Sequence, residues 1–317
     1  MAKIYLSNST NPYENLALEQ HLTFNTQGRV LYLWQNADTV VIGNHQNAWA
    51  ECDLVALEAD GGRLARRTTG GGAVFHDLGN LNFSFITDEE DFSAAENLAI
   101  IADALATLGI KAQATGRNDL TVDGAKISGN AFLHRQGRAL HHGTLLVKSD
   151  MARLGKYLTV HPKKLSAKGV KSVRSRVINL ADVCQDITVD MVKDAIINKY
   201  TCAYACEICP APDVSEYKDA VLHFGSKEFL LGKNPSCTIN MDERFEWGMV
   251  SVGIDAKGDV AVGVAVFTDA LDLDVAPMIK DALTGAALNK DALCAIGQKA
   301  ERAEVKDVIR ALISQLF

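Results

Sequence analysis

Residues 66–77 read Arg-Arg-Thr-Thr-Gly-Gly-Gly-Ala-Val-Phe-His-Asp, a glycine run between basic residues and a histidine. The three glycines, Gly70–Gly72, let the backbone approach a ligand closely and turn its amides toward negative oxygens. Arg66, Arg67 and, farther along the chain, Lys126 can supply the positive charge that a phosphate requires. Loop and lysine together predict a site that forms an adenylate.

Two commoner nucleotide signatures do not fit this loop. A P-loop requires a Lys-Ser or Lys-Thr pair that closes a longer glycine frame, and a dinucleotide fold requires a third, spaced glycine at a helix start. Neither pattern surrounds Gly70–Gly72. For the glycine run taken alone, a plain tight turn is the alternative, because glycine is the usual residue wherever φ is positive.

Residues 119–128 predict a β-hairpin, with an Asp-Gly pair that suits a type I′ turn. The register would pair Thr121 with Lys126. It would also pair Asp119 with Ser128. Because side chains alternate between the two faces of a strand, all four would share one face, with Asp119 beside Lys126. An exposed ion pair without a role is the alternative, but the glycine loop favours an acid and a base that face one ligand.

Further motifs follow in order along the chain. They are Asn15-Leu16-Ala17-Leu18-Glu19, residues 33–43, Gly116–Asp119, Lys126–Gly129, residues 141–146, Ala167-Lys168-Gly169 and residues 172–176. With Arg67 and His76, these motifs resemble the lipoate-protein ligases of the bacterial A type. The resemblance implies an α/β (α+β) fold: a mixed-sheet catalytic domain of the biotin and lipoate ligase type, followed by a small α+β accessory domain.

The resemblance also implies roles for individual residues. Lys126 and Asp119 would be catalytic. The residues expected to contact ATP or lipoyl-AMP are Arg67, Gly70, Gly71, Gly72, Ala73, Val74, Phe75, Asn80, Lys126 and Ser128. The lipoate pocket would include Glu19, Gly72, His76 and His142. The basic segment 163–176 would be the adenylate-binding loop, with Lys164, Lys168, Gly169 and Arg174.

The expected chemistry explains the conspicuous lysine. A carboxylate that attacks a phosphate brings two anions together, and fixed cations offset that repulsion more strongly in a water-poor cleft than in water. Asp119, with Asn118 beside it, would hold Mg²⁺, because magnesium prefers oxygen ligands and commonly uses one or two carboxylates plus phosphate oxygens. ATP and Mg²⁺ are therefore the expected cofactors, without a prosthetic group.

The implied reaction is ATP-dependent formation of lipoyl-AMP, followed by transfer of the lipoyl group to a carrier lysine. The expected acceptors are lipoyl domains of 2-oxoacid dehydrogenase E2 subunits and the glycine cleavage H protein, with no nucleic acid and no membrane as partner. Three alternatives stay open: a transferase that uses only preformed lipoyl-AMP, a ligase that prefers octanoate, and a nonenzymatic lipoyl-adenylate or biotin-type binding module.

Length and composition agree with these expectations. The 317 residues exceed the usual size of one domain, and a hydrophobic fraction of 48% permits a full core. We expect a catalytic domain over residues 1–245 and an accessory domain over residues 246–317. The net charge of −7 argues against nonspecific nucleic-acid binding. No run of eighteen apolar residues and no N-terminal targeting pattern is found, which predicts a cytoplasmic protein.

Periodicity predicts helices and strands on both sides of the proposed boundary. In the first domain, helices are expected at 13–23 and after Ser93, which opens a capping box, and strands at 30–34, 39–42, 81–85 and 144–147. In the second domain, strands are expected at 247–254 and 260–267, and helices at 276–283, 290–298 and 301–316.

Cysteines and histidines are the alternative reactive groups of this chain. An acyl-thioester route requires a cysteine near the ligand, yet none lies between Cys52 and Cys184, which favours an adenylate. The C-x₃-C-x₂-C spacing at residues 202–209 suits an iron–sulfur cluster or zinc, but reduced thiols in a variable segment are the favoured interpretation. His141 and His142 should point to opposite faces of a strand and so should not share a metal ion.

Overall fold

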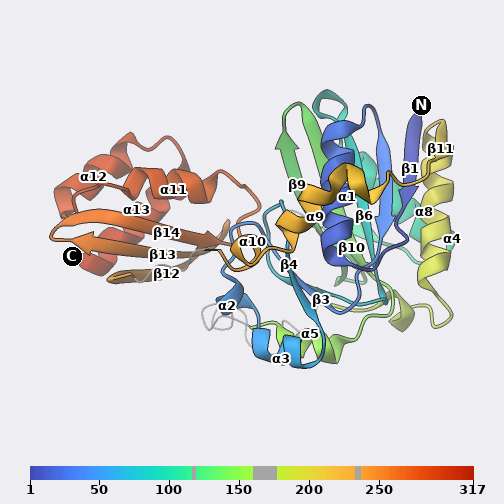
Figure 1. Ribbon diagram of the computed structural model, residues 1–317, viewed down its shortest axis with the longest axis horizontal. Coiled ribbons are helices and arrows are strands. Elements are labelled where there is room, and N and C mark those ends of the chain that lie inside the picture. Colours follow the sequence, from blue (N-terminus) through green and yellow to red (C-terminus); the bar gives the residue numbers. More distant parts are fainter. Residues whose placement is uncertain (116–118, 160–176, 233–236) are drawn as a thin grey trace.

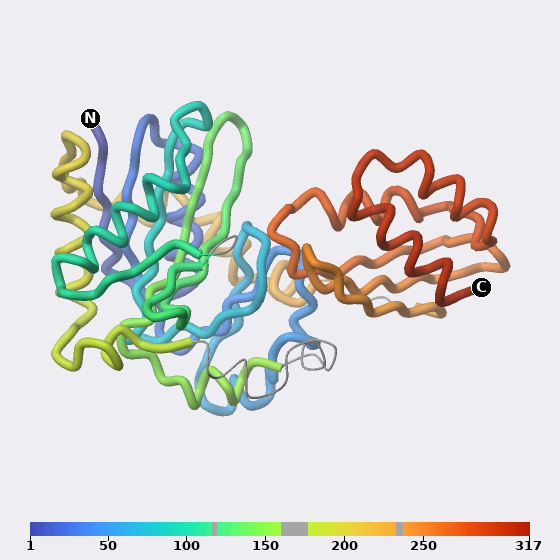
Figure 2. Tube along the Cα trace, turned by 180° about the vertical axis from the view of Figure 1, so that it is seen from behind, coloured from blue at the N-terminus to red at the C-terminus, as the bar shows by residue number. Residues whose placement is uncertain are grey.

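A computed structural model describes residues 1–115, 119–159, 177–232 and 237–317. Figures 1 and 2 show a larger N-terminal body beside a smaller C-terminal one. The larger body is built on a mixed sheet with helices on both faces, and the smaller one packs helices on a second sheet. The expected fold class, an α/β catalytic domain with a small α+β domain, is confirmed.

The large sheet has eight strands in the order β11-β1-β2-β6-β10-β9-β8-β7. The pairs β11–β1 and β1–β2 are parallel, and the other pairs are antiparallel. The strands are β1 (Ala2–Leu6), β2 (Val30–Trp34), β6 (Asn80–Asp88), β7 (Gln113–Thr115), β8 (Asp119–Val122), β9 (Ala125–Arg135), β10 (Arg138–Leu146) and β11 (Cys206–Ile208).

Helices cover both faces of this sheet, because alternate residues of its central strands are apolar on each side (Figure 1). On β2, Leu31 and Leu33 join the core under α4 (Ala94–Thr107) and α8 (Val189–Ala203). Tyr32 and Trp34 face the opposite core, under α1 (Pro12–Asn25) and α9 (Lys218–Phe224).

A smaller sheet carries the glycine loop. Its order is β4-β3-β5, with β3 (Thr39–Ile42), β4 (Arg63–Arg66) and β5 (Val74–His76), and the glycine run connects β4 to β5. Short helices pack against it around Tyr157 and Leu230. They are α2 (Ala48–Glu51), α3 (Leu54–Ala59), α5 (Met151–Tyr157) and α10 (Lys227–Leu231).

The predicted hairpin is formed by β8 and β9. Asp123 and Gly124 have φ values of +50° and +80°, as a type I′ turn requires, and Thr121 pairs with Lys126 as expected. The expected pairing of Asp119 with Ser128 is wrong. The register shifts between Leu120 and Thr121, so Asp119 pairs with Gly129. A bulge of this kind adds one residue to a strand, and the turn sequence cannot reveal it.

Local sequence signals located the two helices predicted in the larger body, α1 and α4, whereas α8 and the shorter helices were not predicted. Ser93 accepts a hydrogen bond from the Glu96 amide at the start of α4, which confirms the predicted cap. Helix α1 begins one residue before the predicted helix because Asn11 caps it and Pro12 occupies its first turn. The predicted strand at 144–147 is the end of a longer one, β10, which already begins at Arg138.

The smaller body consists of β12 (Ile239–Phe245), β13 (Gly248–Lys257) and β14 (Val260–Thr268), with α11 (Val275–Leu283), α12 (Lys290–Lys299) and α13 (Ala303–Leu316). Its strands and helices from β13 onward lie within a few residues of their predicted positions. Strand β12 was missed, and it precedes the boundary expected after residue 245. Because β12 pairs with β13 along its whole length, we propose a boundary before Ile239.

Candidate functional site

One cavity of about 170 Å³ lies where β9 and β10 face the glycine loop. Its apolar part is formed by Leu16 on α1, Trp34 on β2 and Val41 on β3. Its polar and glycine-rich part comes from the loop and the two long strands. These residues are Arg67, Gly71, Gly72, Ala73, Val74, His76, Asn82, Lys126, Gly129, Asn130, Ala131, His142, Gly143 and Thr144. An apolar chain with a charged end matches this polarity.

Lys126 and Asp119 form the ion pair that the hairpin predicted. Lys126 Nζ lies 2.6 Å from Asp119 Oδ1, and both side chains are about one-third exposed, at 35% each. The bulge brings Asp119 opposite Gly129, and a Cβ at Gly129 would lie 3.1 Å from Lys126 Nζ. The absence of a side chain at Gly129 therefore leaves room for the ammonium group to lie at the edge of the cavity.

The glycine loop lies against the C-terminal domain. The Gly71 amide donates to the Ala270 carbonyl at 3.1 Å, and Gly71 has a φ of +93°. A Cβ at Gly70 would lie 2.4 Å from the Ala270 oxygen and 2.6 Å from the Leu271 oxygen. Part of the need for glycine here therefore comes from packing between the two domains. The sequence had suggested a ligand or a plain tight turn as the reason for these glycines.

The two arginines before the loop differ in their surroundings. Arg66 donates to the backbone carbonyls of Gly43, Asn44, Gln46, Phe229 and Leu230. The Arg66 guanidinium therefore stabilises the fold, and we no longer expect it to bind a phosphate. Arg67 lines the cavity and donates to the carbonyls of Gly70 and Gly72, so it shapes the loop. Burial lowers the pKa of each guanidinium to about 10, which leaves both charged at neutral pH.

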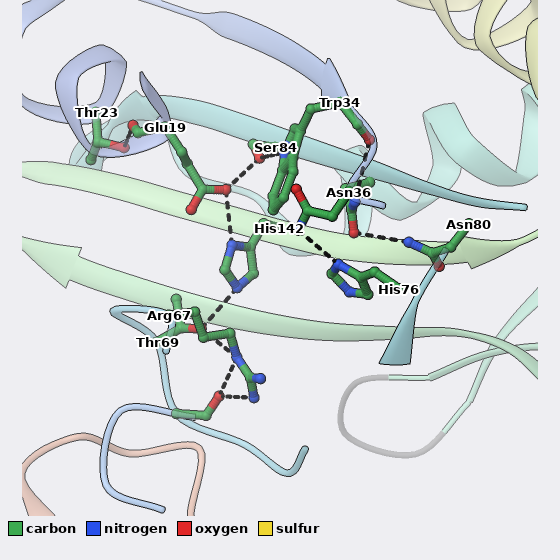
Figure 3. A network of polar contacts seen from close by, with 12 residues as sticks. Glu19, Thr23, Trp34, Asn36, Arg67, Thr69, His76, Asn80, Ser84 and His142 are labelled. Atoms are coloured by element: carbon green, nitrogen blue, oxygen red, sulfur yellow. Dashed lines mark hydrogen bonds and ion pairs between the residues drawn. The ribbon is translucent and has the colours of Figure 1, made fainter. Parts of the chain in front are cut away.

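Glu19 and His142 lie in a hydrogen-bonded network behind the cavity wall (Figure 3). Glu19 is 2% exposed, and its Oε1 lies 2.9 Å from His142 Nδ1 and 2.5 Å from Ser84 Oγ. His142 lines the cavity, whereas Glu19 reaches it through His142. Glu19 is thus buried rather than a surface charge.

His76 also lines the cavity, from the end of β5. Its Nδ1 lies 3.2 Å from Asn36 Nδ2, an amide nitrogen that can only donate. His76 Nδ1 is therefore the acceptor, and the ring proton is on Nε2. Burial, together with the nearby charge of Arg67, lowers the pKa of His76 to about 3. His76 is therefore neutral at physiological pH.

The prediction that the two adjacent histidines diverge is confirmed. His141 points away from the cavity into an aromatic cluster and lies within hydrogen-bond distance of Asn97 and Asn130. Burial lowers the pKa of His141 to about 3. His142 faces the cavity instead.

Four residues expected to bind ATP or lipoyl-AMP do not line the cavity. Phe75 is buried in the core with Tyr157, Asn80 donates to Asn82, and Ser128 is fully buried. The fourth is Gly70, and the remaining members of that set line the cavity. The predicted adenylate-binding loop, with Lys164, Lys168, Gly169 and Arg174, lies outside the described residues, as does Asn118.

Cysteines lie apart from this cavity. Cys52 is buried beneath α2 and α3, and burial raises the pKa of its thiol to about 12. Cys202 lies in α8, whereas Cys206 and Cys209 lie at the edge strand β11 and just after it. Over the ranges that the structure describes, no group of three or more His, Cys, Asp or Glu residues is arranged to hold a metal ion.

Sequence reasoning did not assign Trp34, Asn82 or Asn130 to the site, although all three line the cavity. Trp34 lies in the motif at residues 33–43, but in the sequence it looks like one of several apolar strand residues. Asn130 lies beyond the bulge in β9 and contacts His141, so strand alternation counted from Lys126 does not predict its place at the cavity. Asn82 reaches the cavity only because β6 lies next to β10 in the sheet.

Two family models match the chain, one in each domain. The model described as the lipoyl protein ligase A/B catalytic domain matches residues 11–201, and that described as the bacterial lipoate protein ligase C-terminus matches residues 234–315. The chain is 39% identical to a lipoate-protein ligase A of Psychrobacter cryohalolentis, over 99% of this chain and 98% of that protein.

Solved structures agree with both domains. P. falciparum LipL1 in complex with lipoate matches with a TM-score of 0.86 and 27% identity over 100% of this chain and 99% of that one. A bipartite lipoate protein ligase of Thermoplasma acidophilum, studied with its E2 lipoyl domain, matches with a TM-score of 0.65 and 28% identity over 75% and 99%. A lipoate-protein ligase A bound with ATP matches with a TM-score of 0.63 and 27% identity over 73% and 98%.

Proposed function

The chain belongs to the lipoate-protein ligase family, and we propose that its Lys126 and Asp119 activate lipoate at the mouth of the cavity. The observation that carries this proposal is the 2.6 Å pair of Lys126 and Asp119, beside a cavity with an apolar part. The enzyme is a ligase, and its relatives include proteins with lipoate or with ATP bound.

Activation joins two anions. A carboxylate oxygen of lipoate attacks the α-phosphorus of ATP, the bond from that phosphorus to the bridging oxygen breaks, and pyrophosphate leaves. Lys126 would hold the attacking carboxylate and the α-phosphate together, because its compact ammonium can donate to both. The acyl chain would lie against Leu16, Trp34 and Val41, where its burial excludes water from the reacting atoms.

Magnesium fits Asp119 as one carboxylate ligand that acts together with phosphate oxygens, the arrangement this ion commonly adopts. When bound there, the ion would neutralise part of the charge on the phosphates. Asp119 does not line the cavity itself, but its carboxylate is one-third exposed and contacts Lys126, which does. Lys126 would then exchange part of its interaction with Asp119 for the incoming anions.

The basic segment 163–176 supports the same site. Val177, the first described residue after it, forms a bridge with Lys126, and the Ile178 amide donates to the Lys126 carbonyl at 3.0 Å. The chain therefore leaves this segment directly beside the proposed catalytic lysine. We expect its Lys164, Lys168, Gly169 and Arg174 to contact the adenylate.

In the second half-reaction the ε-amine of a carrier lysine attacks the acyl carbon of lipoyl-AMP, AMP leaves, and the amine loses a proton. We propose lipoyl domains of 2-oxoacid dehydrogenase E2 subunits and the glycine cleavage H protein as acceptors. The Thermoplasma relative, studied with its E2 lipoyl domain, supports the first. Since activation consumes ATP, we expect the reaction in the cytoplasm. No helix in the described part of the chain is long and apolar enough to cross a membrane.

Mass spectrometry of a purified lipoyl domain tests this function. The domain is incubated with the protein, ATP, Mg²⁺ and either lipoate or octanoate, and a matched sample omits ATP. We expect acylation of one lysine that depends on ATP. Acylation that occurs only in a sample supplied with lipoyl-AMP would contradict the activation step. No acylation, either with ATP and a free acid or with lipoyl-AMP, would contradict the function.

A further inference from the structure

A chain of hydrogen bonds runs behind the cavity from Arg67 to Trp34 (Figure 3). Arg67 Nε lies 3.1 Å from Thr69 Oγ1, and Thr69 Oγ1 lies 2.8 Å from His142 Nε2. His142 Nδ1 then contacts Glu19, which also accepts from Ser84. At the far end, Trp34 Nε1 donates to Ser84 Oγ at 3.0 Å.

The two ends fix the direction of every bond. Arg67 Nε and Trp34 Nε1 can only donate. From Arg67 the donors therefore lead through Thr69 and His142 to Glu19, and from Trp34 they lead through Ser84 to Glu19. Glu19 is the one carboxylate in this chain of hydrogen bonds. Glu19 Oε1 accepts from both Ser84 and His142. All these residues are buried, and Thr69, Glu19 and Ser84 do not line the cavity.

Thr69 decides where His142 carries its proton. Over the described residues, the only hydrogen-bond partners found for the Thr69 hydroxyl are Arg67 Nε and His142 Nε2. If His142 Nε2 carried a proton, both partners would donate and the hydroxyl hydrogen of Thr69 would have no acceptor. A buried donor left without a partner costs about 1–3 kcal/mol. The arrangement is complete only when His142 Nε2 accepts from Thr69 and Nδ1–H donates to Glu19.

We propose that Thr69 is a positioning residue that holds His142 neutral, with its proton on Nδ1, and so makes the wall of the acyl site apolar. With both ring nitrogens engaged by Glu19 and Thr69, His142 can offer the cavity only its carbon surface. The same hydroxyl contacts Arg67 Nε, which also donates to the Gly70 carbonyl, and Arg67 Nη2 donates to the Gly70 and Gly72 carbonyls of the glycine loop. Thr69 itself does not line the cavity, so it acts through these two residues.

The proton position follows from geometry alone, whereas its effect on lipoate binding rests on the proposed function. The two parts are therefore tested separately. For the first, ¹⁵N NMR of histidine-labelled protein at pH 7.5 distinguishes the two neutral tautomers and the cation, with the His142 signal assigned by its loss in a His142→Asn variant. We expect protonated Nδ1 and unprotonated Nε2. An Nε2–H tautomer or an imidazolium at His142 would overturn the proposal.

For the second part, Thr69→Val removes the hydroxyl at nearly constant volume, and Thr69→Ser retains it. We expect kcat/KM for lipoate to fall about 5- to 140-fold in Thr69→Val, the equivalent of one unpaired buried group. Thr69→Ser should restore both the rate and the His142 tautomer. Thr87→Val is the matched control, because the buried Thr87 hydroxyl on β6 has no partner within the described ranges. A folded Thr69→Val enzyme with unchanged tautomer and unchanged kcat/KM would overturn the role of Thr69.

Discussion

Lys126→Met should remove most of the adenylate-forming activity and leave the fold intact. A positive charge about 4 Å from a phosphate charge contributes about 4 kcal/mol at an effective dielectric constant of about 20, which corresponds to a loss of about a thousandfold in rate. The free energy of unfolding should change by no more than about 1 kcal/mol, because Lys126 and Asp119 are each 35% exposed and such pairs are weak. Methionine retains the apolar stem, so the change tests the charge.

Lipoate-dependent pyrophosphate release measures the rate, and urea unfolding measures the stability. Lys126→Arg should fail as well, although it keeps the charge. The Lys126 ammonium packs where a Cβ on Gly129 would be only 3.1 Å away, and a broad planar guanidinium cannot occupy that position. A folded Lys126→Met protein that releases pyrophosphate within about tenfold of the unchanged rate would refute a charge contribution of this size.

Four further outcomes are expected. Gly129→Ala should displace the Lys126 ammonium and lower pyrophosphate release without a large loss of stability, and an unchanged rate would contradict the packing argument. His76→Gln should make the free energy of unfolding less sensitive to acid. The pKa of His76 is about 3 in the folded state, below its ordinary value of 6.5. The free energy of unfolding therefore falls as the pH drops below about 6.5, by about 1.4 kcal/mol per pH unit, and the variant should lose this contribution. Urea unfolding at pH 6 and pH 4 checks this, with the exposed His134→Gln as control; an equal slope in both variants would be inconsistent with a buried neutral His76. Serine at all three cysteines 202, 206 and 209 should leave carrier lipoylation intact, and loss of activity together with a bound metal would argue for a cluster. Removal of the C-terminal domain from residue 234 onward should impair synthesis of lipoyl-AMP more than transfer from supplied lipoyl-AMP, since Ala270 contacts the glycine loop; a folded truncation with full activation would show the domain to be dispensable for that step.

Local signals in the sequence were sufficient for many elements and for the ion pair of Asp119 and Lys126. The Asp-Gly turn predicted the hairpin and brought Asp119 to Lys126, because a type I′ turn fixes which residues face each other nearby. The Ser93 cap located α4 for a similar reason, since capping involves groups three residues apart. Strands β2 and β3 match their predicted bounds, because fully buried short strands are continuous apolar runs.

Contacts between distant segments could not be obtained in this way. The bulge that moves Asp119 to Gly129, the addition of β12 to the C-terminal sheet and the use of Arg66 by backbone carbonyls all depend on which strand or helix lies alongside. No pattern within a window of sequence records that neighbour.

The sequence by itself therefore determined the glycine loop and the acid–base pair, since each depends on residues close along the chain, and its resemblance to the lipoate-protein ligases implied the fold class. Only the tertiary structure decided that Gly70 is needed where Ala270 and Leu271 approach, and that Glu19 is a buried carboxylate which His142 and Ser84 share. The physical reason is the same in both cases. Burial and hydrogen-bond partnership are properties of the assembled core, and a residue type acquires its charge state and its role only from the groups that the fold brings next to it.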